Sequence, residues 1–390
     1  MKRTTLRPLA LLLLALASRG GCGSAAVVDA PEEILAPVDM GQEDDQIAAA
    51  APDLLEPRSF RVVTYEGSGE LVHPDAVVPP RGWKRHHFWF VATPYPLGNA
   101  RYENPSLFQG DAADDWQVPD GAANPLAMPE RTGYLSDPDL VLDPVRGELR
   151  LYYRQTVRDV DQIYLLTTRD GVRWSGAQRV LEQPRYGLIS PAVVREDDGS
   201  WRMWTVNARY NGCSASASQI ALAQRRSPDG LAWGTPSPVQ LAIPGRVPWH
   251  WDVQYIAARK EYWALVTAFR DGGTCSESAL YFARSTDGTT WRVSPSPLLG
   301  PGVLTRMNDL VYRSTFRYSA RTDAVTVWYS GAYLDGGGFH FSLATARYPF
   351  AALLARVERT VPASVSRSRE ERERLPSVRA ARQAFANAFP

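Results

Sequence analysis

The sequence predicts an all-β protein made of repeated antiparallel sheets, and two patterns support this prediction. From residue 58 onward, short runs rich in Val, Tyr, Phe and Trp alternate with Gly, Pro and Asp, and no amphipathic helical pattern occurs before Pro349. The second pattern is a set of tryptophans that lie 58, 59 and 58 residues apart, namely Trp116, Trp174, Trp233 and Trp291. A structural repeat returns the same residue to the same place in each unit, so this spacing indicates repeated units.

Three of these tryptophans end a similar seven-residue sequence phrase that contains Asp-Gly, at residues 168–174, 227–233 and 285–291. Residues 110–115, before the first tryptophan, match this phrase only in part. Asp and Gly tolerate the left-handed backbone of a tight turn. We interpret the phrase as a turn whose tryptophan fills the gap between neighbouring sheets.

Alignment of the chain on its tryptophans gives five units of short strands. Five four-stranded sheets arranged radially form a β-propeller, which protects its edges by closing on itself. We therefore predict a five-bladed β-propeller over residues 58–350, with residues 60–65 completing the last blade. An Arg-rich C-terminal extension, 351–390, contains two short helical patterns at 353–359 and 378–388.

The N-terminal residues 1–22 have the basic start, the short apolar run and the small residues of an export signal. They resemble a bacterial lipoprotein signal, in which Cys22 is acylated, although Arg19 departs from that pattern and leaves ordinary cleavage open. Residues 23–57 are rich in Ala, Pro, Asp and Glu and are expected to form a disordered tether. We expect an exported protein, either an outer-membrane or cell-surface lipoprotein or a periplasmic or secreted one.

The net charge bears on the partners of the protein, and the cysteines bear on its crosslinks. A formal net charge of +1 argues against a nucleic-acid partner, and we expect a monomer. Cys213 and Cys275 lie in equivalent connections of two adjacent units. In an oxidising compartment this predicts a disulfide between them, and the alternative is two free thiols.

Polar residues open the first strand of each unit, and in a propeller these strands line the central channel. The starts read His73-Pro-Asp75, Asp137-Pro-Asp139, Ser190-Pro-Ala192, His250-Trp-Asp252 and Asn308-Asp309. Side chains two residues apart share a face of a strand, so carboxylates from several units are aimed at one volume. Carboxylates in a cleft push each other's pKa values apart, which suits the acid and the base of glycoside hydrolysis. For any single Asp, capping of a turn is the structural alternative.

This pattern resembles the five-bladed propeller glycosidases over residues 70–348. They include the arabinanases and xylosidases of glycoside hydrolase family 43, related fructan-cleaving enzymes and mannoside phosphorylases. The resemblance implies that Asp75 is the general base or nucleophile and that Asp139, or Asp137, orients and tunes the acid. The third unit lacks the glutamic acid that usually donates the proton, so we assign the acid to Asp252, with Glu103 as the alternative.

Further side chains are predicted to contact the sugar, and Tyr333 is one of them. The others are His73, Trp83, Tyr95, Glu103, Asp137, Arg154, Asn207, Trp251, Arg270 and Asp309. Aromatic faces suit sugar rings, although packing between blades explains a single tryptophan as well. The glycines at 336–338 fit either a mobile loop or a plain hairpin.

The sequence therefore favours an exported glycosidase that cleaves an extracellular or envelope polysaccharide, with a furanoside such as arabinan as the first candidate. It predicts no cofactor, and it contains no ligand set specific enough to assign a metal. The alternative of a different class is a carbohydrate-binding or structural propeller that has lost its acid. A sialidase-like enzyme is a lesser alternative, because such enzymes have six units and this chain has five.

Overall fold

The computed structural model describes residues 56–79, 82–129, 133–307 and 309–358. The predicted signal with Cys22, most of the tether and the second C-terminal helix lie outside these residues. Within the described residues, no helix has the length and apolar character needed to cross a membrane.

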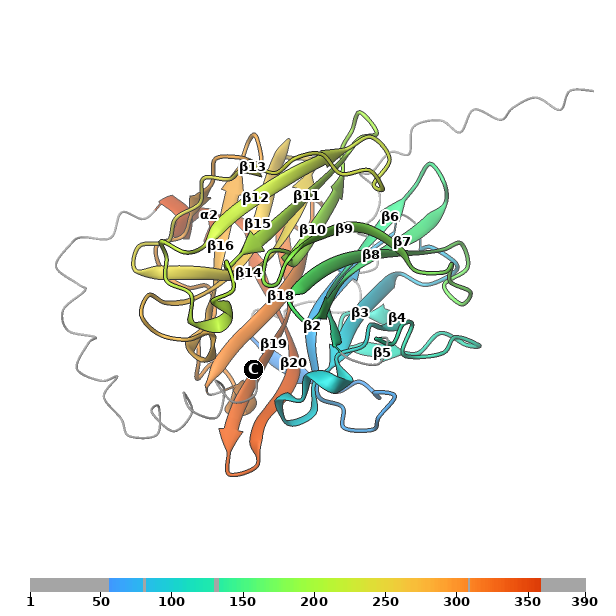
Figure 1. Ribbon diagram of the computed structural model, residues 1–390, viewed down its shortest axis with the longest axis horizontal. Helices are drawn as coiled ribbons and strands as arrows, with labels where there is room; N and C mark the ends of the chain where they lie inside the picture. The colour runs from blue at the N-terminus through green and yellow to red at the C-terminus, as the bar shows by residue number, and fades with distance from the viewer. Residues whose placement is uncertain (1–55, 80–81, 130–132, 308, 359–390) are drawn as a thin grey trace, which may run out of the picture. The chain divides into compact units, whose positions relative to one another are not determined.

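The described chain forms five four-stranded antiparallel sheets, which confirms the predicted all-β, five-bladed propeller (Figure 1). The first blade contains β2 (Leu71–Val77), β3 (Phe88–Pro94), β4 (Ser106–Ala112) and β5 (Asp115–Gln117). The second contains β6 (Tyr134–Asp143), β7 (Glu148–Val157), β8 (Val160–Thr168) and β9 (Gln178–Pro184). The third contains β10 (Ile189–Arg195), β11 (Trp201–Asn207), β12 (Ala221–Ser227) and β13 (Ser237–Pro238). The fourth contains β14 (Arg246–Ile256), β15 (Glu261–Arg270), β16 (Ala279–Ser285) and β17 (Arg292–Val293).

The last blade joins the two ends of the propeller. It contains β18 (Leu310–Ser319), β19 (Ala324–Asp335), β20 (Gly338–Pro349) and β1 (Arg58–Phe60). Strand β1 pairs with β20, and Phe60 lies opposite Leu343. The closing strand was expected at 60–65, but it ends at Phe60 because residues 64–67 form a turn closed by the Gly67 amide and the Thr64 carbonyl, 3.1 Å apart.

Inner strands β2, β6, β10, β14 and β18 contact one another in a closed cycle. Figure 1 shows β10, β14, β18 and β2 side by side in the middle of the propeller. Short 3-10 turns occupy the connections, namely η2 (Pro96–Gly98), η3 (Ala100–Tyr102), η4 (Gly212–Ser214), η5 (Cys275–Glu277) and η6 (Thr305–Met307). Every inner strand therefore presents residues to one central channel.

The Asp-Gly turns lie between the third and fourth strands of a blade and pack on the second strand of the preceding blade. A Cβ added to Gly171 would meet the Trp89 ring at 2.2 Å. Tyr152 donates a hydrogen bond to the Gly230 carbonyl (3.0 Å). Trp204 Nε1 donates one to the Gly288 carbonyl (2.8 Å). The turn predicted from the phrase is therefore also the contact that joins successive blades.

Helix α2 (Phe350–Glu358) provides the corresponding contact between the fourth and fifth blades. The Phe350 ring stacks on Trp263 of β15, with centroids 4.4 Å apart and planes 7° apart. The helix was expected from residue 353, but it starts directly after β20, so that Phe350 reaches this position. The short C-terminal helix thus closes an interface that lacks an Asp-Gly turn.

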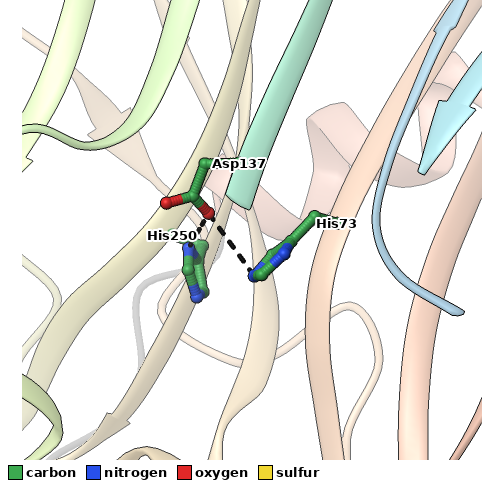
Figure 2. Close-up of side chains that lie close together, drawn as sticks. All are labelled: His73, Asp137 and His250. Carbon is green, nitrogen blue, oxygen red and sulfur yellow. Dashed lines mark ion pairs between the residues drawn. The ribbon is translucent and has the colours of Figure 1, made fainter. Parts of the chain in front are cut away.

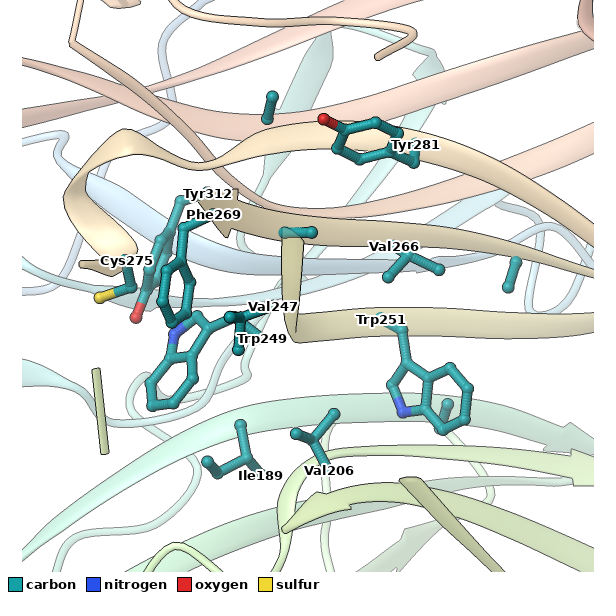
Figure 3. Packing of buried hydrophobic residues seen from close by; sticks show 14 of the residues in the cluster. Ile189, Val206, Val247, Trp249, Trp251, Val266, Phe269, Cys275, Tyr281 and Tyr312 are labelled. Carbon is teal, nitrogen blue, oxygen red and sulfur yellow. The ribbon is translucent and has the colours of Figure 1, made fainter. Parts of the chain in front are cut away.

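The predicted disulfide between Cys213 and Cys275 is present and joins the connections of the third and fourth blades. Cys275 is buried in the apolar core between these blades. Figure 3 shows Ile189 and Val206 of the third blade facing Val247 and Trp249 of the fourth. The crosslink and the core therefore stabilise the same interface.

Gly171→Ala tests the contact between blades, with Gly147→Ala as its control. Both glycines have a positive φ, but a Cβ at Gly147 meets no atom within 4 Å. The left-handed backbone costs either alanine about 1–2 kcal/mol, and overpacking against Trp89 adds roughly 1–3 kcal/mol at Gly171 only. Denaturant unfolding should show the larger loss of stability for Gly171→Ala. Equal losses would contradict the packing role.

Candidate functional site

The inner strands of the first three blades carry an irregularity where they enter the channel. His73, Asp137 and Ser190 have positive φ values of 53°, 51° and 48°, and each precedes a proline. The pairing of each inner strand shifts register at this point. Such a bulge re-aims side chains, and left-handed residues other than glycine cluster at functional sites.

Two sets of side chains result, two residues apart on each inner strand. The first set contains His73, Asp137, Ser190, His250 and Arg313. The second contains Asp75, Asp139, Ala192, Asp252 and Thr315, which lie opposite Val91, Tyr152, Trp204, Leu265 and Trp328 in their hairpins. Each of the five inner strands therefore carries the same two side-chain positions, but the residue types at these positions differ from blade to blade.

The pairing of β18 with β19 corrects the prediction that Asn308-Asp309 is the strand start of the fifth blade. The equivalent of the other strand starts is Arg313-Ser314-Thr315, because Thr315 lies opposite Trp328. Asp309 instead accepts a hydrogen bond from the Leu334 amide (2.6 Å), and Asn308 lies outside the described residues. The expected carboxylate at this start is thus replaced by a guanidinium group and a hydroxyl group.

Asp75, Asp139 and Asp252 form the carboxylate cluster, whose ligand atoms lie within 4.8 Å of one another. The expected convergence of these residues is confirmed. Asp75 Oδ2 accepts a hydrogen bond from the Leu140 amide of the second blade. Asp139 Oδ2 accepts one from the Val193 amide of the third blade (3.1 Å). Both carboxylates therefore hold the next blade in place.

Thr315 continues these links through the fifth blade. Its hydroxyl oxygen lies 2.8 Å from Asp75 Oδ1 and 3.0 Å from Asp252 Oδ2. Burial raises the pKa of Asp75 and of Asp139, and it raises that of Asp252 to about 7. The catalytic roles of the three aspartates stay a prediction, since all three side chains also have structural partners.

His73, Asp137 and His250 form the histidine cluster, whose ligand atoms also lie within 4.8 Å of one another. Figure 2 shows both imidazole rings directed toward the Asp137 carboxylate. Asp137 Oδ1 lies 3.4 Å from His73 Nε2 and 3.4 Å from His250 Nδ1. All three residues are buried and come from three different blades.

The polar atoms of the histidine cluster are only partly satisfied. His73 Nδ1 lies 3.1 Å from the Thr93 hydroxyl, and His250 Nδ1 lies 2.6 Å from the Ser190 hydroxyl. Among the described residues, neither Nε2 atom has a hydrogen-bond partner. The Asp137 oxygens form no hydrogen bond either, but Oδ2 is paired with Arg154 at 2.8 Å and Oδ1 lies 3.4 Å from both rings. Buried polar atoms are usually hydrogen-bonded, so the two imidazole Nε2 atoms are open to a ligand.

The protonation states suit a cation. Burial lowers the pKa of His73 to about 3 and that of His250 well below its usual value. Burial opposes ionisation of Asp137, but Arg154 and, less strongly, the imidazoles and Arg313 keep its pKa below the usual value. Neutral imidazole and ionised carboxylate are the forms that bind metal ions.

Other groups surround the histidine cluster. Glu103 follows η3, and its Oε1 lies 3.4 Å from His73 Nδ1. Burial, followed by the charge of Asp137, raises the pKa of Glu103 well above its usual value. Arg154 Nε lies 2.8 Å from Asp137 Oδ2. The Tyr312 ring lies 4.6 Å from His250 between centroids.

The donor set fits a divalent transition-metal ion. Two imidazoles and one carboxylate are common ligands of zinc and of related ions. Arg154 occupies Asp137 Oδ2 and leaves Oδ1 directed at both rings. A partner on the outer oxygen orients a ligating carboxylate. The sequence placed these three residues at strand starts that line the channel, but it did not group them as metal ligands.

Arg313 was also not predicted from the sequence. Its guanidinium group is 1% exposed and lies 3.8 Å from Asp137 Oδ1. Within the part of the chain that the structure describes, its three nitrogens have no hydrogen-bond partner. The signal that finds it is the position two residues before Thr315, which appears once the fifth hairpin is counted back from Trp328.

Several predicted sugar contacts have other positions. Trp251 is 1% exposed and packs on Trp291 in the core, so it presents no face to a ligand. Tyr95 is also buried in this core. Asn207 ends β11 and accepts a hydrogen bond from the Arg209 amide (2.9 Å), which shapes its own loop. Of the predicted contacts, His73, Glu103, Asp137 and Arg154 lie together.

Comparisons with known proteins agree with this architecture. No protein-family model matches the sequence. The chain is 29% identical to an A type blood N-acetyl-alpha-D-galactosamine deacetylase from Flavonifractor plautii, in an alignment that covers 68% of this chain. It spans 40% of that relative's length.

Two solved structures share the fold. One is an N-acetylgalactosamine deacetylase from F. plautii in complex with blood group B trisaccharide, with a TM-score of 0.70, 23% identity and coverage of 79% of this chain and 100% of that one. The other is a xylan beta-1,4-xylosidase from Bacillus halodurans, with a TM-score of 0.54, 14% identity and coverage of 71% and 52%. The chain thus has the five-bladed propeller fold of enzymes that act on carbohydrates, as the resemblance implied.

Metal binding tests the histidine cluster directly. After dialysis against Zn²⁺ and removal of free ion, we expect about one zinc per chain, measured by mass spectrometry. Asp137→Asn or His250→Ala should lower zinc affinity by about 10-fold or more, because each removes a ligand atom. His86→Ala is the control, since His86 lies near the surface beside Asp111. Unchanged zinc in both cluster variants would contradict the assignment.

Proposed function

We propose that the chain is a hydrolase that removes the acetyl group from an N-acetylated amino sugar of a polysaccharide. The histidine cluster is the observation that carries this proposal, because it brings two neutral imidazoles and a carboxylate within 4.8 Å of one another, beside the carboxyl group of Glu103. The similarity to an N-acetylgalactosamine deacetylase supports the same reaction class.

Deacetylation requires attack of water on an amide carbonyl and protonation of the departing amine. A divalent cation in the cluster would supply a Lewis acid that polarises the carbonyl and lowers the pKa of water. Two buried imidazoles and Asp137 would hold it. Arg154 acts as a positioning residue, because its contact with Asp137 Oδ2 fixes the direction of the other carboxylate oxygen.

Glu103 is the residue to which we assign proton transfer. Its carboxyl group is buried, and its proton affinity is raised by that burial and by Asp137. In its ionised form this carboxylate would take a proton from the attacking water, and the carboxylic acid so formed would give that proton to the departing amine. Tyr312 and the two imidazoles shape the site around the reacting group.

A glycosidase is the second candidate, and the carboxylate cluster favours it. Asp139 and Asp252 have raised pKa values next to Asp75, which suits an acid and a nucleophile. In this reading a furanoside such as arabinan remains the first substrate to examine.

We also propose that the protein is exported and acts as a monomer, anchored through Cys22 or released after cleavage of its signal. The Cys213–Cys275 disulfide supports an oxidising compartment outside the cytoplasm. An envelope or extracellular glycan is then the accessible substrate.

Glu103→Gln tests the assigned proton transfer. The substitution keeps the shape of the side chain but cannot accept a proton, so acetate release from N-acetylgalactosamine and N-acetylglucosamine oligosaccharides should fall by about 10²–10⁴-fold in kcat. Glu182→Gln, on the exposed strand β9, is the control. Circular dichroism establishes that both variants fold.

A different set of results is expected if the carboxylate cluster is the catalytic site. If the protein is instead a glycosidase, arabinan will release reducing ends, Asp75→Asn will abolish that release, and Glu103→Gln will leave it largely intact. Reducing-end release with that pattern and no acetate release would replace the deacetylase proposal.

A further inference from the structure

A cavity of about 160 Å³ lies beside the last blade, at the ends of its strands that face the histidine cluster. It is formed by the segment between β1 and β2, by η6 and by the hairpin of β19 and β20. The residues that define its chemistry are Arg61, Glu70, Arg306, Tyr333, His340 and Phe341. Neither the relatives nor the proposed reaction assigns a role to it.

The cavity has an excess of positive charge. Arg61 and Arg306 are exposed, and among the described residues neither forms an ion pair. Glu70 is the carboxylate in the lining, but both of its oxygens have partners. Oε1 lies 2.9 Å from His340 Nδ1, and Oε2 accepts a hydrogen bond from the Leu97 amide (3.0 Å). Two guanidinium groups therefore remain available to an anion.

The His340 imidazole offsets the charge of Glu70. Burial lowers its pKa, but Glu70 and Asp335 outweigh that effect and raise it above the usual value. Its ring stacks on Tyr333, with centroids 4.9 Å apart and planes 16° apart. The cavity thus offers a flat ring pair beside two unpaired cations, and such surfaces suit a sugar ring that carries an acid group.

The wall of the cavity is held in place by the glycine-rich hairpin. Gly338 has a φ of 131°, and a Cβ there would lie 3.3 Å from the Leu97 carbonyl oxygen. The tip of the last blade therefore lies against η2 of the first blade. This contact favours a fixed hairpin over a mobile loop.

The cavity is connected to the histidine cluster by aromatic side chains. The Phe341 ring, which lines the cavity, lies 6.0 Å from Tyr312 between centroids. Tyr312 in turn lies 5.4 Å from His73. The cavity and the histidine cluster therefore lie only two ring contacts apart.

We propose that this cavity is a subsite for an acidic sugar unit, whose anionic group is bound by Arg61 and Arg306. The inference rests on the proposed function for the identity of the neighbouring unit, but the binding preference stands on the cavity alone. A carboxylate of a uronic acid and a sulfate ester share the required chemistry. Bidentate contact with guanidinium favours either group over a neutral sugar.

Binding assays on the full chain test this proposal. The probes are oligosaccharides that alternate N-acetylglucosamine with glucuronic acid, the same compounds after reduction of the carboxyl groups to alcohols, and the reduced compounds with sulfate esters. Calorimetry should give an affinity about 10-fold or more higher for one or both charged forms than for the neutral form. The carboxylated and sulfated arms identify which anion is preferred.

The double variant Arg61→Gln/Arg306→Gln should reduce this preference to about 2-fold or less. The matched control, Arg173→Gln/Arg292→Gln, removes two exposed arginines elsewhere and should retain the preference. Equal affinity of the wild type for neutral and charged forms, or no binding of any, would overturn the proposal. So would an unchanged preference in the double variant.

The outcome is distinguishable from failure of the proposed function. Glu103→Gln should retain the preference for charged oligosaccharides, because binding at the cavity requires no proton transfer. If the wild type shows the preference but releases no acetate, the subsite stands and the deacetylase proposal fails. If acetate is released without any preference, the reverse holds.

Discussion

The closure of the propeller by β1 and β20 is the interaction on which the site depends. Pairing of Phe60 with Leu343 brings the first and last blades together, so that Thr315 reaches Asp75. Without this closure His73 would not face Asp137 and His250. Ring closure converts residues that are far apart in sequence into two compact clusters, and it leaves no long sheet edge exposed.

The two clusters show how one repeated position acquires two roles. In the carboxylate cluster, Asp75 and Asp139 bind backbone amides of the next blade, so their acidity and their structural role are linked. Two residues earlier on the same strands, His73 and Asp137 lack such partners within the described chain. Reactivity is therefore expected where polar atoms are buried without partners, and stability where they are satisfied.

Much of the fold could be predicted because equivalent positions in the repeated blades carry the same type of residue. The tryptophan spacing identified the five blades, and equivalent loops identified the disulfide. The choice between the two clusters could not be made, since His73 and Asp75 share a face and sequence does not reveal which has hydrogen-bond partners. Arg313 was hidden because the fifth strand start was placed at Asn308-Asp309, whereas the pairing of Thr315 with Trp328 puts the equivalent position at Arg313, four residues beyond Asp309. Burial of Trp251 likewise depends on packing between blades.

The bond that the protein cleaves decides which of the two clusters is catalytic. An amino-sugar polysaccharide labelled with ¹³C in the acetyl carbonyl and at the anomeric carbon would be followed by NMR during incubation with the metal-loaded protein. If the protein is a deacetylase, free acetate will appear while the glycosidic anomeric signals stay unchanged. New reducing-end signals with the acetyl group still attached would contradict the deacetylase proposal and would assign catalysis to the carboxylate cluster.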